Sequence, residues 1–475
     1  MGLAKRVFHL ADQMGFANAS GDCNPIHVDA VQARRTQAGA PVVHGIHLLL
    51  WALDAFAAHQ PELPPICGVR AQFYKYIYLG EPVELVLNLQ KPSSVRLSLC
   101  VDGVARTKLV IDIGEITGKG PDWTDVPCRP VPYKATPLDL PFDQFADYSG
   151  RLDLHMTAET ALSLFPAASR WFGVRRIAAL AASTYLVGMV CPGLHSIYSQ
   201  ISISGCDFPT RDFLDFRVTN SDPSFRLVDL EIVGGGISGM VNSFARQPPV
   251  AQLSMLSLKG SVTADEFAGS LALIVGGSRG LGELTAKLIA AGGGRVLITW
   301  QSGKEDAERV AEEIRAAGGL CETLHYDACK PASEQLSTLT EAPSHAYYFA
   351  TPAIFKPQAG VFSSERFHEF FDVYVHGFWQ LMQALLARQL RLSAFYPSSV
   401  AVAERPKGMT EYTMAKAAGE VLCADLNKAL SPSHVTISRL PRLATDQTAS
   451  VTAVETADPL ETMLPIVREV QSWPR

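Results

Sequence analysis

Two side chains that can exchange protons lie five residues apart near the start of the chain. The segment FANASGDCNPIHVDAVQA, residues 16–33, carries Asp22 and His27 around a turn that contains a glycine, Asn24 and Pro25. A carboxyl group and an imidazole can hold one water molecule between them, one acting as base and the other as acid. One reaction that needs such a pair is the addition of water to a conjugated acyl thioester, or its removal.

The same chemistry needs hydrogen-bond donors for the enolate oxygen that forms on the thioester. Backbone N–H groups at a helix start can donate, and Gly45 in VVHG lets an oxygen approach the backbone closely. The alternative is that GDCNP is only a turn and that His27 only begins a helix. His44 and His47 could suggest a metal pair, but no third ligand follows at a suitable spacing. We therefore predict no metal, and expect both to pack or to line a pocket.

A glycine-rich turn in the second half of the chain indicates a dinucleotide site. The string VGGSRGLG follows a short apolar run and precedes a helical pattern, so a phosphate can approach the helix start closely. Its G-x3-G-x-G spacing differs from the G-x-G-x-x-G fingerprint. The residues that we expect to contact the nucleotide here are Gly276, Gly277, Ser278, Arg279, Gly280, Leu281 and Gly282.

Three side chains further along could move a proton to or from a carbonyl oxygen. Tyr412 and Lys416 are four residues apart on one helix face, and Ser399 precedes them at a strand end. A lysine ammonium beside a phenol favours the phenolate and lowers the pKa of the tyrosine below its usual ~10. Tyr412 can then protonate a ketone oxygen as a hydride arrives, and Ser399 can hydrogen-bond the same oxygen. A Tyr-x3-Lys pair alone would be a surface accident.

The charges near the glycine turn favour NADP(H). The segment TWQSGK, at the end of the second strand of this half, has no acid before Glu305, whereas an NAD site places one there for the ribose hydroxyls. Arg279, Lys304 and Ser302 could instead bind a 2′-phosphate. The cofactor that we predict is therefore NADP(H).

The patterns around these motifs predict a multidomain chain. Strands alternate with helices over 266–475, which predicts an α/β Rossmann-type, doubly wound parallel sheet. Residues 1–118 contain a long apolar helix followed by antiparallel strands, which predicts an α+β domain with a sheet wrapped around a helix. A proline-rich segment, 119–150, reads as a linker, and 151–262 repeat the helix-then-strands order.

The string SGDxNPIHxD followed by VVHG resembles the MaoC-like, (R)-specific enoyl hydratase/dehydratase family, which has the hotdog fold. The resemblance covers roughly residues 7–115. It implies that Asp22 and His27 are catalytic, that Asn24 is an active-site residue and that the backbone at Gly45 forms the oxyanion hole. The repeat region that follows lacks an Asp-x4-His string. It resembles the non-catalytic half of a double hotdog, which would cover the sheet edge and form an acyl tunnel.

The glycine turn with Ser399, Tyr412 and Lys416 resembles the short-chain dehydrogenases/reductases of the ketoacyl reductase type. This resemblance covers about 268–450 and implies nucleotide contacts at Asp327, which ends the third strand, and at Ala350. It also implies a homodimer.

Four positions depart from the reductase pattern and reshape the nicotinamide pocket. The usual Thr-Gly, NNAG and Pro-Gly are replaced by Val275-Gly276, Ala350–Ala353 and Pro441-Arg442, and the usual catalytic Asn aligns with Tyr374. The proton relay behind Lys416 is therefore altered. One alternative is that the reductase half is a degenerate nucleotide-binding scaffold. Another is that the hotdog half only binds acyl groups while the reductase acts on an unrelated ketone.

The two implied activities share an intermediate, so together they imply a bifunctional lyase and oxidoreductase. A reductase converts a 3-oxoacyl thioester to the (R)-3-hydroxyacyl form, and a dehydratase converts that to the trans-2-enoyl form. The substrate would be carried by coenzyme A or by an acyl carrier protein, in fatty-acid-like or polyketide-like biosynthesis. Hydration followed by oxidation, the degradative direction, is the alternative; the preference for NADP(H) favours reduction.

The bulk composition excludes other classes. A net charge of −6 gives no basic field for nucleic acid. Nine scattered cysteines without a CxxC pair fit a reduced cytosol. Residues 177–206 carry no formal charge, but the apolar run breaks at Pro192-Gly193, short of the ~20 residues that span a bilayer. With no signal-peptide pattern at the start, we expect a cytoplasmic protein without a membrane segment, and a buried helix followed by a strand over 177–206.

Overall fold

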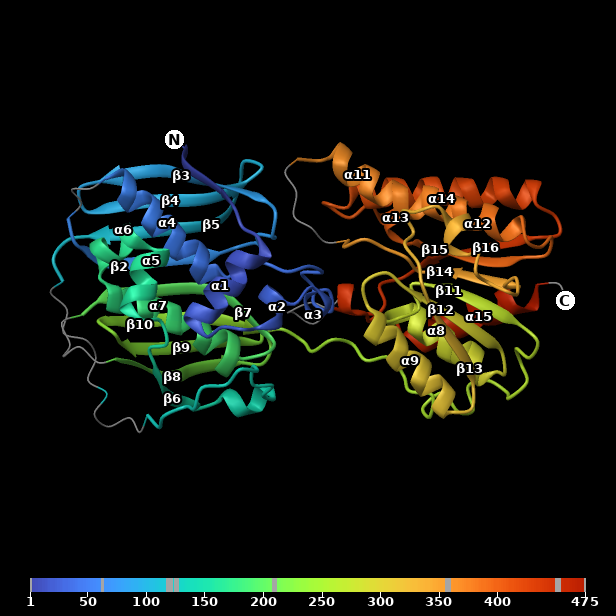
Figure 1. The fold of residues 1–475 in the computed structure, drawn as a ribbon, viewed down its shortest axis with the longest axis horizontal. Coiled ribbons are helices and arrows are strands. Elements are labelled where there is room, and N and C mark those ends of the chain that lie inside the picture. The colour runs from blue at the N-terminus through green and yellow to red at the C-terminus, as the bar shows by residue number, and fades with distance from the viewer. Residues whose placement is uncertain are drawn as a thin grey trace. The chain divides into compact units, whose positions relative to one another are not determined.

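The computed structural model describes residues 2–60, 64–116, 123, 128–206, 212–354, 360–448 and 454–473. The described residues up to Pro248 form one compact unit, here the N-terminal unit, and those from Pro249 form the C-terminal unit (Figure 1). Within these ranges, every helix is too short or too polar to cross a bilayer.

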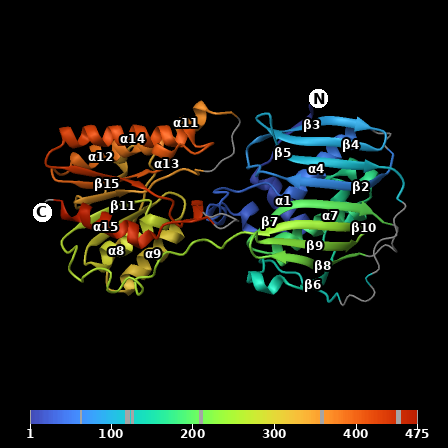
Figure 2. The same cartoon turned by 180° about the vertical axis from the view of Figure 1, so that it is seen from behind.

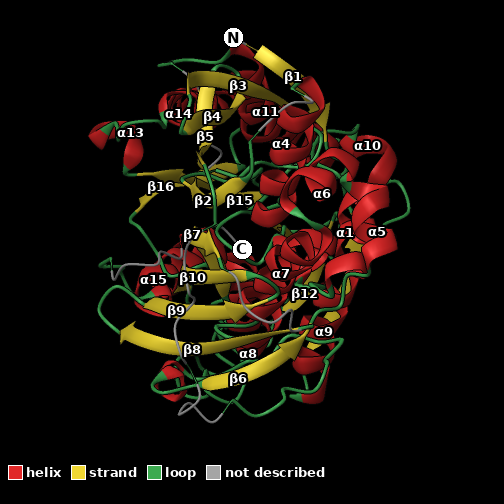
Figure 3. Cartoon of the chain, turned by 90° about the vertical axis from the view of Figure 1, so that its left-hand side faces the viewer, coloured by secondary structure: helices red, strands yellow, loops and turns green. Residues whose placement is uncertain are grey.

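The N-terminal unit is built on a ten-stranded antiparallel sheet that contains an internal repeat. The strands are β1 (Gly2–Val7), β2 (Ile66–Phe73), β3 (Pro82–Lys91), β4 (Ser94–Val101), β5 (Val104–Ile113), β6 (Ser149–Asp153), β7 (Ser196–Gly205), β8 (Phe213–Asp222), β9 (Leu227–Gly234) and β10 (Ile237–Ala245). The first half follows the order β1-β3-β4-β5-β2 and the second half the matching order β6-β8-β9-β10-β7 (Figures 2 and 3). The halves join where β2 pairs with β7, from Gly68 opposite Ser204 to Gln72 opposite Gln200.

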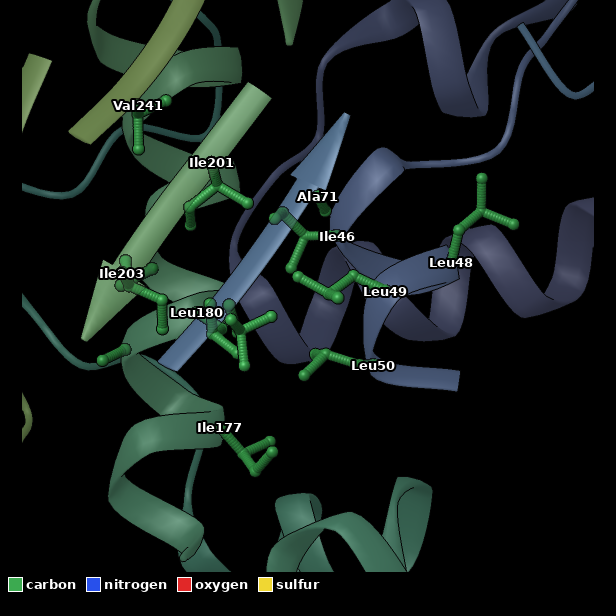
Figure 4. Packing of buried hydrophobic residues seen from close by; sticks show 14 of the residues in the cluster. Ile46, Leu48, Leu49, Leu50, Ala71, Ile177, Leu180, Ile201, Ile203 and Val241 are labelled. Carbon is green, nitrogen blue, oxygen red and sulfur yellow. The ribbon is translucent and has the colours of Figure 1, made fainter. Parts of the chain in front are cut away.

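Helices cover one face of this sheet, and helices and strands both contribute to the core between them. The long ones are α1 (Leu10–Ser20), α4 (Gly45–His59) and α7 (Val174–Tyr185), and the short ones are α2 (Pro25–Val28), α3 (Ala30–Ala33), α5 (Ala158–Leu164) and α6 (Pro166–Phe172). Ile46 and Leu49 of α4 and Leu180 of α7 are fully buried and lie over Ala71 and Ile201 of the joining strands (Figure 4). Because α4 is apolar on nearly every side, it needs a sheet wrapped around it. This arrangement confirms the expected α+β fold.

The segment between the two repeats packs against the N-terminal unit where the structure describes it. The Val131 N–H donates to the Arg151 carbonyl at 2.8 Å, and the Leu138 N–H donates to the Met189 carbonyl at 2.9 Å. Tyr133 stacks on Tyr185 with ring centroids 5.5 Å apart. Although residues 128–148 are rich in proline, they form backbone hydrogen bonds and a ring contact with the N-terminal unit. The rest of the predicted linker, apart from residue 123, lies outside the described residues.

The uncharged stretch 177–206 folds as expected, into a buried helix and a strand. Helix α7 continues into a π-helical turn, η2 (Leu186–Val190), and the chain then enters β7. This turn brings Gly188 and the end of α7 to the side of the first repeat.

The C-terminal unit is a doubly wound parallel sheet, as the strand–helix alternation predicts. Its strands are β11 (Leu271–Val275), β12 (Arg295–Trp300), β13 (Leu320–His325), β14 (His345–Tyr348), β15 (Ser393–Ser399) and β16 (His434–Leu440), in the order β13-β12-β11-β14-β15-β16. The strand order reverses between β11 and β14, where such sheets bind ligands beyond the carboxyl ends of the strands.

Helices cover both faces of the parallel sheet. One face carries α8 (Gly280–Ala291), α9 (Lys304–Ala316) and α15 (Pro459–Ser472), and the other carries α12 (Phe378–Leu386) and α14 (Thr410–Ala429) (Figure 1). The shorter helices are α10 (Ala332–Gln335), α11 (Ser364–Phe371) and α13 (Ala401–Glu404). Met255 and Leu258 are buried in this core, so residues 249–262 join the C-terminal unit although the sequence placed them before it.

Truncating one fully buried side chain of α7 should destabilise the N-terminal unit. Leu180 is 0% exposed, so Leu180→Ala leaves a cavity that costs about 2–5 kcal/mol of unfolding free energy. Leu162 of α5 is 44% exposed, and Leu162→Ala should change the free energy by less than about 0.5 kcal/mol. Chemical denaturation followed by circular dichroism measures both. Equal losses in the two variants would contradict the packing.

Candidate active sites

Asp22 and His27 are placed by the turn that joins α1 to α2. Helix α1 ends at Gly21, whose φ of 83° is left-handed and therefore suits glycine. The side-chain oxygen of Asn24 then accepts a hydrogen bond from the Ile26 N–H at 3.2 Å and begins α2. The GDCNP string thus builds two helix ends in succession, with Asp22 between them and His27 on α2.

The carboxyl group of Asp22 is removed from water and held on both oxygens. Asp22 is 1% exposed; Oδ1 accepts the Asn24 N–H at 3.1 Å, and Oδ2 accepts the Thr184 hydroxyl at 2.7 Å. Gly188 makes room for it, because a Cβ at that position would lie 2.3 Å from Asp22 Oδ1. Burial raises the pKa of the Asp22 carboxyl, although the neighbouring His27 and the Thr184 hydroxyl oppose the rise.

The ring of His27 is neutral and has a fixed tautomer. Its Nδ1 lies 2.8 Å from the Val42 carbonyl oxygen, which can only accept, so Nδ1 carries the proton and Nε2 keeps a lone pair. The ring stacks on His44 with centroids 3.8 Å apart. Burial, with a contribution from His44, lowers the pKa of His27 to about 3. Asp22 and His27 therefore have pKa values that their surroundings push in opposite directions.

A single cavity brings together three of the predicted site residues of the first repeat, whereas Asn24 does not line it. Its lining includes Asp22, His27 and Gly45, together with Thr184, Gly188, Ser196 and Tyr198 from the second repeat. Gly45 is the first residue of α4, whose N-terminal N–H groups have no partner within the helix. A Cβ on Gly45 would lie 3.1 Å from the Phe73 ring, so a larger residue here would require the ring to shift.

Asn24 connects the two repeats. Its Nδ2 donates to the carbonyl oxygens of Gly188 at 2.7 Å and Gly193 at 3.2 Å. With its Oδ1 at the start of α2, Asn24 thus places the Asp22 turn against η2 of the second repeat. Thr184 and Gly188 were not singled out as site residues by the sequence, and no motif surrounds them. The only signal was the presence of polar groups in an otherwise apolar stretch.

His44 and His47, at the start of α4, do not point to one shared metal site. His47 stacks on Phe16 with centroids 4.5 Å apart, so it packs in the core. Donor atoms of Asp22, His27 and His44 lie within 4.8 Å of one another. However, both ring nitrogens of His44 already lie within hydrogen-bond distance of oxygen atoms of the protein, Gln13 Oε1 at 2.8 Å and the Asp22 carbonyl at 3.0 Å. We treat this cluster as a proton-transfer site.

Arg176 and His195 of the second repeat have structural partners. Arg176 Nε donates to the Gly236 carbonyl at 3.1 Å, and its guanidinium also donates to the Phe172 carbonyl at 3.2 Å. His195 Nε2 lies 3.3 Å from an Asp139 carboxylate oxygen. Neither residue lines the cavity described above.

The glycine turn of the C-terminal unit has the geometry of a phosphate cradle. Gly276 adopts a left-handed φ of 82°, and a Cβ on Gly282 would lie 2.2 Å from the Gly276 carbonyl oxygen. Gly280 begins α8 with a φ of 59°, and a Cβ there would meet only a methyl group of Thr445 at 4.0 Å. The turn is therefore closed on its inner side and open at the helix start, where an anion binds.

The other predicted nucleotide contacts lie around the same sheet edge or follow neighbouring strands. Ser278 is buried, Leu281 packs on the core, Ser302 follows β12 and is exposed, and Ala350 follows β14 and is half-buried. Asp327 follows β13, and its carboxylate accepts the Cys329 N–H at 3.0 Å. Arg279 faces an acid rather than open space, because its guanidinium lies 3.3 Å from the Asp446 carboxylate.

Ser399, Tyr412 and Lys416 come together at the carboxyl end of β15. Ser399 ends that strand, and its hydrogen bond to Tyr412 lowers the pKa of the phenol, but burial outweighs this and the pKa of Tyr412 is raised. The expected lowering by Lys416 is therefore wrong for this state. The Lys416 Nζ lies 6.0 Å from the Tyr412 ring centroid and donates instead to the Pro397 carbonyl at 2.7 Å.

Two family models match the chain, and each match contains one of these sites. The model "MaoC like domain" matches residues 4–106, which include Asp22, His27 and Gly45. The model "short chain dehydrogenase" matches residues 270–457, which include the glycine turn and the three residues around β15.

The chain joins a MaoC-like domain to a short-chain dehydrogenase domain. Thr184 and Gly188, which contact Asp22, lie outside both matched ranges.

Curated relatives match parts of the chain. An uncharacterized oxidoreductase of Mycobacterium bovis is 37% identical over 89 residues, 18% of this chain and 26% of that protein. An uncharacterized oxidoreductase of Methylorubrum extorquens is 30% identical over 127 residues, 25% of this chain and 50% of that protein. The 2,5-dichloro-2,5-cyclohexadiene-1,4-diol dehydrogenase LinX of Sphingobium indicum is 43% identical over 70 residues, 15% of this chain and 28% of that protein. The chain thus spans between a quarter and a half of the length of these relatives.

Solved structures similar to the chain include dehydrogenases and reductases. A short chain dehydrogenase of Escherichia coli, complexed with NADPH, has a TM-score of 0.40 and 19% identity over 44% of this chain and 93% of that one. A 3-oxoacyl (acyl-carrier-protein) reductase of Agrobacterium tumefaciens, with NADP bound, has a TM-score of 0.39 and 16% identity over 43% of this chain and 88% of that one.

Adding one methyl group at Gly188 should disturb the MaoC-like domain through Asp22. The Cβ of Gly188→Ala would overlap the carboxylate, and we expect a loss of about 1–3 kcal/mol in unfolding free energy. Gly15 lies within α1 with open space at its Cβ position, so Gly15→Ala should leave stability unchanged or raise it by up to about 1 kcal/mol. Denaturant titration compares the two. Gly188→Ala as stable as the wild type would show that Asp22 does not lie against this turn.

Proposed function

We propose that the chain is a bifunctional acyl-thioester enzyme. Its MaoC-like domain dehydrates (R)-3-hydroxyacyl thioesters to trans-2-enoyl thioesters, reversibly, and its dehydrogenase domain reduces 3-oxoacyl thioesters with NADPH. The observation that carries the first activity is the cavity lined at once by Asp22, His27 and the start of α4. These groups are an acid, a base and backbone donors, which are the three components that reversible hydration needs.

In the hydration direction, His27 is the base and Asp22 is the acid. The lone pair on His27 Nε2 accepts a proton from water, and the hydroxide oxygen bonds to C3 of the enoyl thioester. Burial raises the pKa of Asp22 and so favours the protonated carboxyl group, whose proton would pass to C2. The imidazolium then returns a proton to the carboxylate, and the site is restored. Dehydration follows the same steps in reverse.

The enolate that forms between these steps is stabilised by the start of α4. Its oxygen would accept hydrogen bonds from the backbone N–H groups that begin at Gly45, where the helix dipole is positive. The Phe73 ring against Gly45 helps to keep water away from this position. The remaining lining, with Tyr198 and Ser196 of the second repeat, would hold the acyl chain.

The dehydrogenase domain fits NADP(H). The cradle of Gly276–Gly282 is open at the N-terminus of α8, where a pyrophosphate binds, and the segment after β12 carries Ser302 and Lys304 but no acid before Glu305. Arg279, Ser302 and Lys304 would hold the 2′-phosphate, and Arg279 would then exchange its Asp446 partner for the phosphate. Asp327 and Ala350 would contact the adenine and nicotinamide ends. When bound, NADPH supplies a hydride.

Within this domain, Tyr412 would protonate the carbonyl oxygen of the 3-oxoacyl thioester. Ser399, which already hydrogen-bonds Tyr412, would donate to the same oxygen and orient it. Lys416 would supply positive charge beside the phenol and the ribose. The product is the (R)-3-hydroxyacyl thioester that the MaoC-like domain consumes. We propose coenzyme A or a carrier protein as the acyl carrier, and a homodimer as the assembly.

One observation favours a second candidate function, a hydratase without reductase activity. The pKa of Tyr412 is raised, and the Lys416 Nζ lies closer to the ring centroid of Tyr374, at 3.8 Å, than to that of Tyr412, at 6.0 Å. In that case the dehydrogenase domain would bind the nucleotide without transferring hydride. NADPH oxidation by the wild type, measured beside the two variants described next, separates the two candidates.

Single substitutions should silence one activity at a time. Asp22→Asn removes the acid, so hydration of crotonyl-CoA should fall by about 10²–10⁴-fold while NADPH oxidation with acetoacetyl-CoA is unchanged. Tyr412→Phe removes the other proton donor, so NADPH oxidation should fall by about 10²–10⁴-fold while hydration is unchanged. Absorbance of the enoyl thioester and of NADPH follows the two reactions.

Each pattern of results has one meaning. If the wild type hydrates crotonyl-CoA but never oxidises NADPH, the hydratase-only function holds. If Asp22→Asn keeps full hydration, the acid has been misassigned. If both activities survive both changes, neither site is where we place it.

A further inference from the structure

An aromatic cluster surrounds the catalytic pair of the dehydrogenase domain. Phe370 and Tyr374 stack with centroids 5.7 Å apart, and both rings meet the edge of Tyr412, at 5.7 and 5.8 Å. Tyr374 is 1% exposed and lies in a π-helical turn, η3 (Asp372–Gly377), between α11 and α12. Such turns rotate a side chain out of the regular helical position. Here the turn places the Tyr374 ring beside both Tyr412 and Lys416.

Lys416 is a buried cation whose charge faces this ring. The residue is 6% exposed, and its Nζ lies 3.8 Å from the Tyr374 centroid. Its hydrogen bond goes to the Pro397 carbonyl at 2.7 Å, and within the described part of the chain it forms no ion pair. A cation over an aromatic face is attracted by the negative face of the ring, most when water is excluded.

The titratable groups around Lys416 give its charge little other support. Burial raises the pKa values of Tyr374, Tyr396 and Tyr412, so these phenols stay uncharged at neutral pH. The pKa of the Cys423 thiol, about two turns further along α14 than Lys416, is also raised. Glu420, one turn further along α14, is paired with Arg439. Burial lowers the pKa of Lys416 to about 7, so half of the charge is lost near neutrality. Any group that favours the ammonium form therefore controls the protonation of this lysine.

The hydroxyl of Tyr374 has a separate contact. It lies 2.5 Å from Thr351 Oγ1, and Thr351 in turn donates to the Pro352 carbonyl at 3.0 Å. The single hydroxyl hydrogen of Thr351 is used there, so Tyr374 donates to Thr351. These residues belong to the segment after β14 that contains Ala350, and the ring and hydroxyl of one side chain thus reach two parts of the site.

We propose that Tyr374 is a positioning residue of the dehydrogenase site, whose ring holds Lys416 in its charged form beside Tyr412 and whose hydroxyl fixes the Ala350–Ala353 segment. This proposal rests on the proposed reductase function. It gives a role to Tyr374, which stands where the reductase pattern has a catalytic Asn: its aromatic face stabilises the Lys416 ammonium. The ring and the hydroxyl act independently, so they can be removed one at a time.

The ring is tested by Tyr374→Leu with Phe370→Leu as the matched control. Both changes replace a buried aromatic ring of the same cluster, but Phe370 has no contact with the Lys416 ammonium. Without the ring, the pKa of Lys416 falls further, so the ammonium is lost at lower pH. In Tyr374→Leu only, we expect the alkaline loss of NADPH binding to move down by about one pH unit, so that the Kd rises about fivefold at pH 7 and about tenfold above pH 8.

Two readouts are needed for each variant. NADPH fluorescence measures the Kd against pH without turnover, and NADPH oxidation with acetoacetyl-CoA measures the pH profile of the reaction. Tyr374→Phe keeps the ring, so its pH dependence should match the wild type, while its KM for NADPH rises because the Thr351 contact is lost.

The outcomes separate this proposal from the proposed function. If Phe370→Leu shifts the pH dependence as much as Tyr374→Leu, Tyr374 has only a packing role and the proposal is overturned. The proposal is also overturned if the wild type binds NADPH with the same Kd throughout this pH range. If binding shifts as expected but no variant, the wild type included, oxidises NADPH, the positioning role stands and the reductase function fails.

Discussion

A carboxyl group that is taken out of water must find hydrogen bonds inside the protein, and the catalytic site of the MaoC-like domain is arranged around this requirement. Asp22 is 1% exposed and cannot be satisfied by its own turn alone. The first repeat supplies the Asn24 N–H, and the second supplies the Thr184 hydroxyl and the space beside Gly188. The acid is therefore held only when both repeats are in place.

This constraint gives the second repeat a function although it has no acid–base pair of its own. Its helix α7 and turn η2 carry the groups that contact Asp22, and strand β7 continues the sheet of the first repeat. Asn24 adds hydrogen bonds to two carbonyl oxygens of the turn. The same principle governs the dehydrogenase domain with the opposite charge, where buried Lys416 has a carbonyl oxygen and an aromatic face as partners. In both domains, burial shifts the pKa of an ionisable group toward its uncharged form.

The local parts of this architecture could be predicted from the sequence and the distant contacts could not. GDCNPIH specifies its own turn and places Asp22 near His27, and the glycine turn specifies a strand-to-helix junction. Thr184 lies 162 residues from its partner and has no motif, so only the folded sheet brings them together. The expected lowering of the Tyr412 pKa was wrong because burial, which residue spacing does not show, raises the pKa of the phenol. Residue spacing also does not show the π-helical turn that brings the Tyr374 ring against Lys416.

The central claim is that two successive reactions on one acyl thioester are carried out by one chain. The most direct test is to incubate the purified protein with acetoacetyl-CoA and NADPH and to identify the acyl products by mass over time. Consumption of NADPH with the 3-hydroxyacyl thioester appearing first and the 2-enoyl thioester following is the predicted result. Consumption of NADPH with a 3-hydroxyacyl thioester that is never dehydrated, or no reaction with this substrate or with its carrier-protein form, would contradict the account.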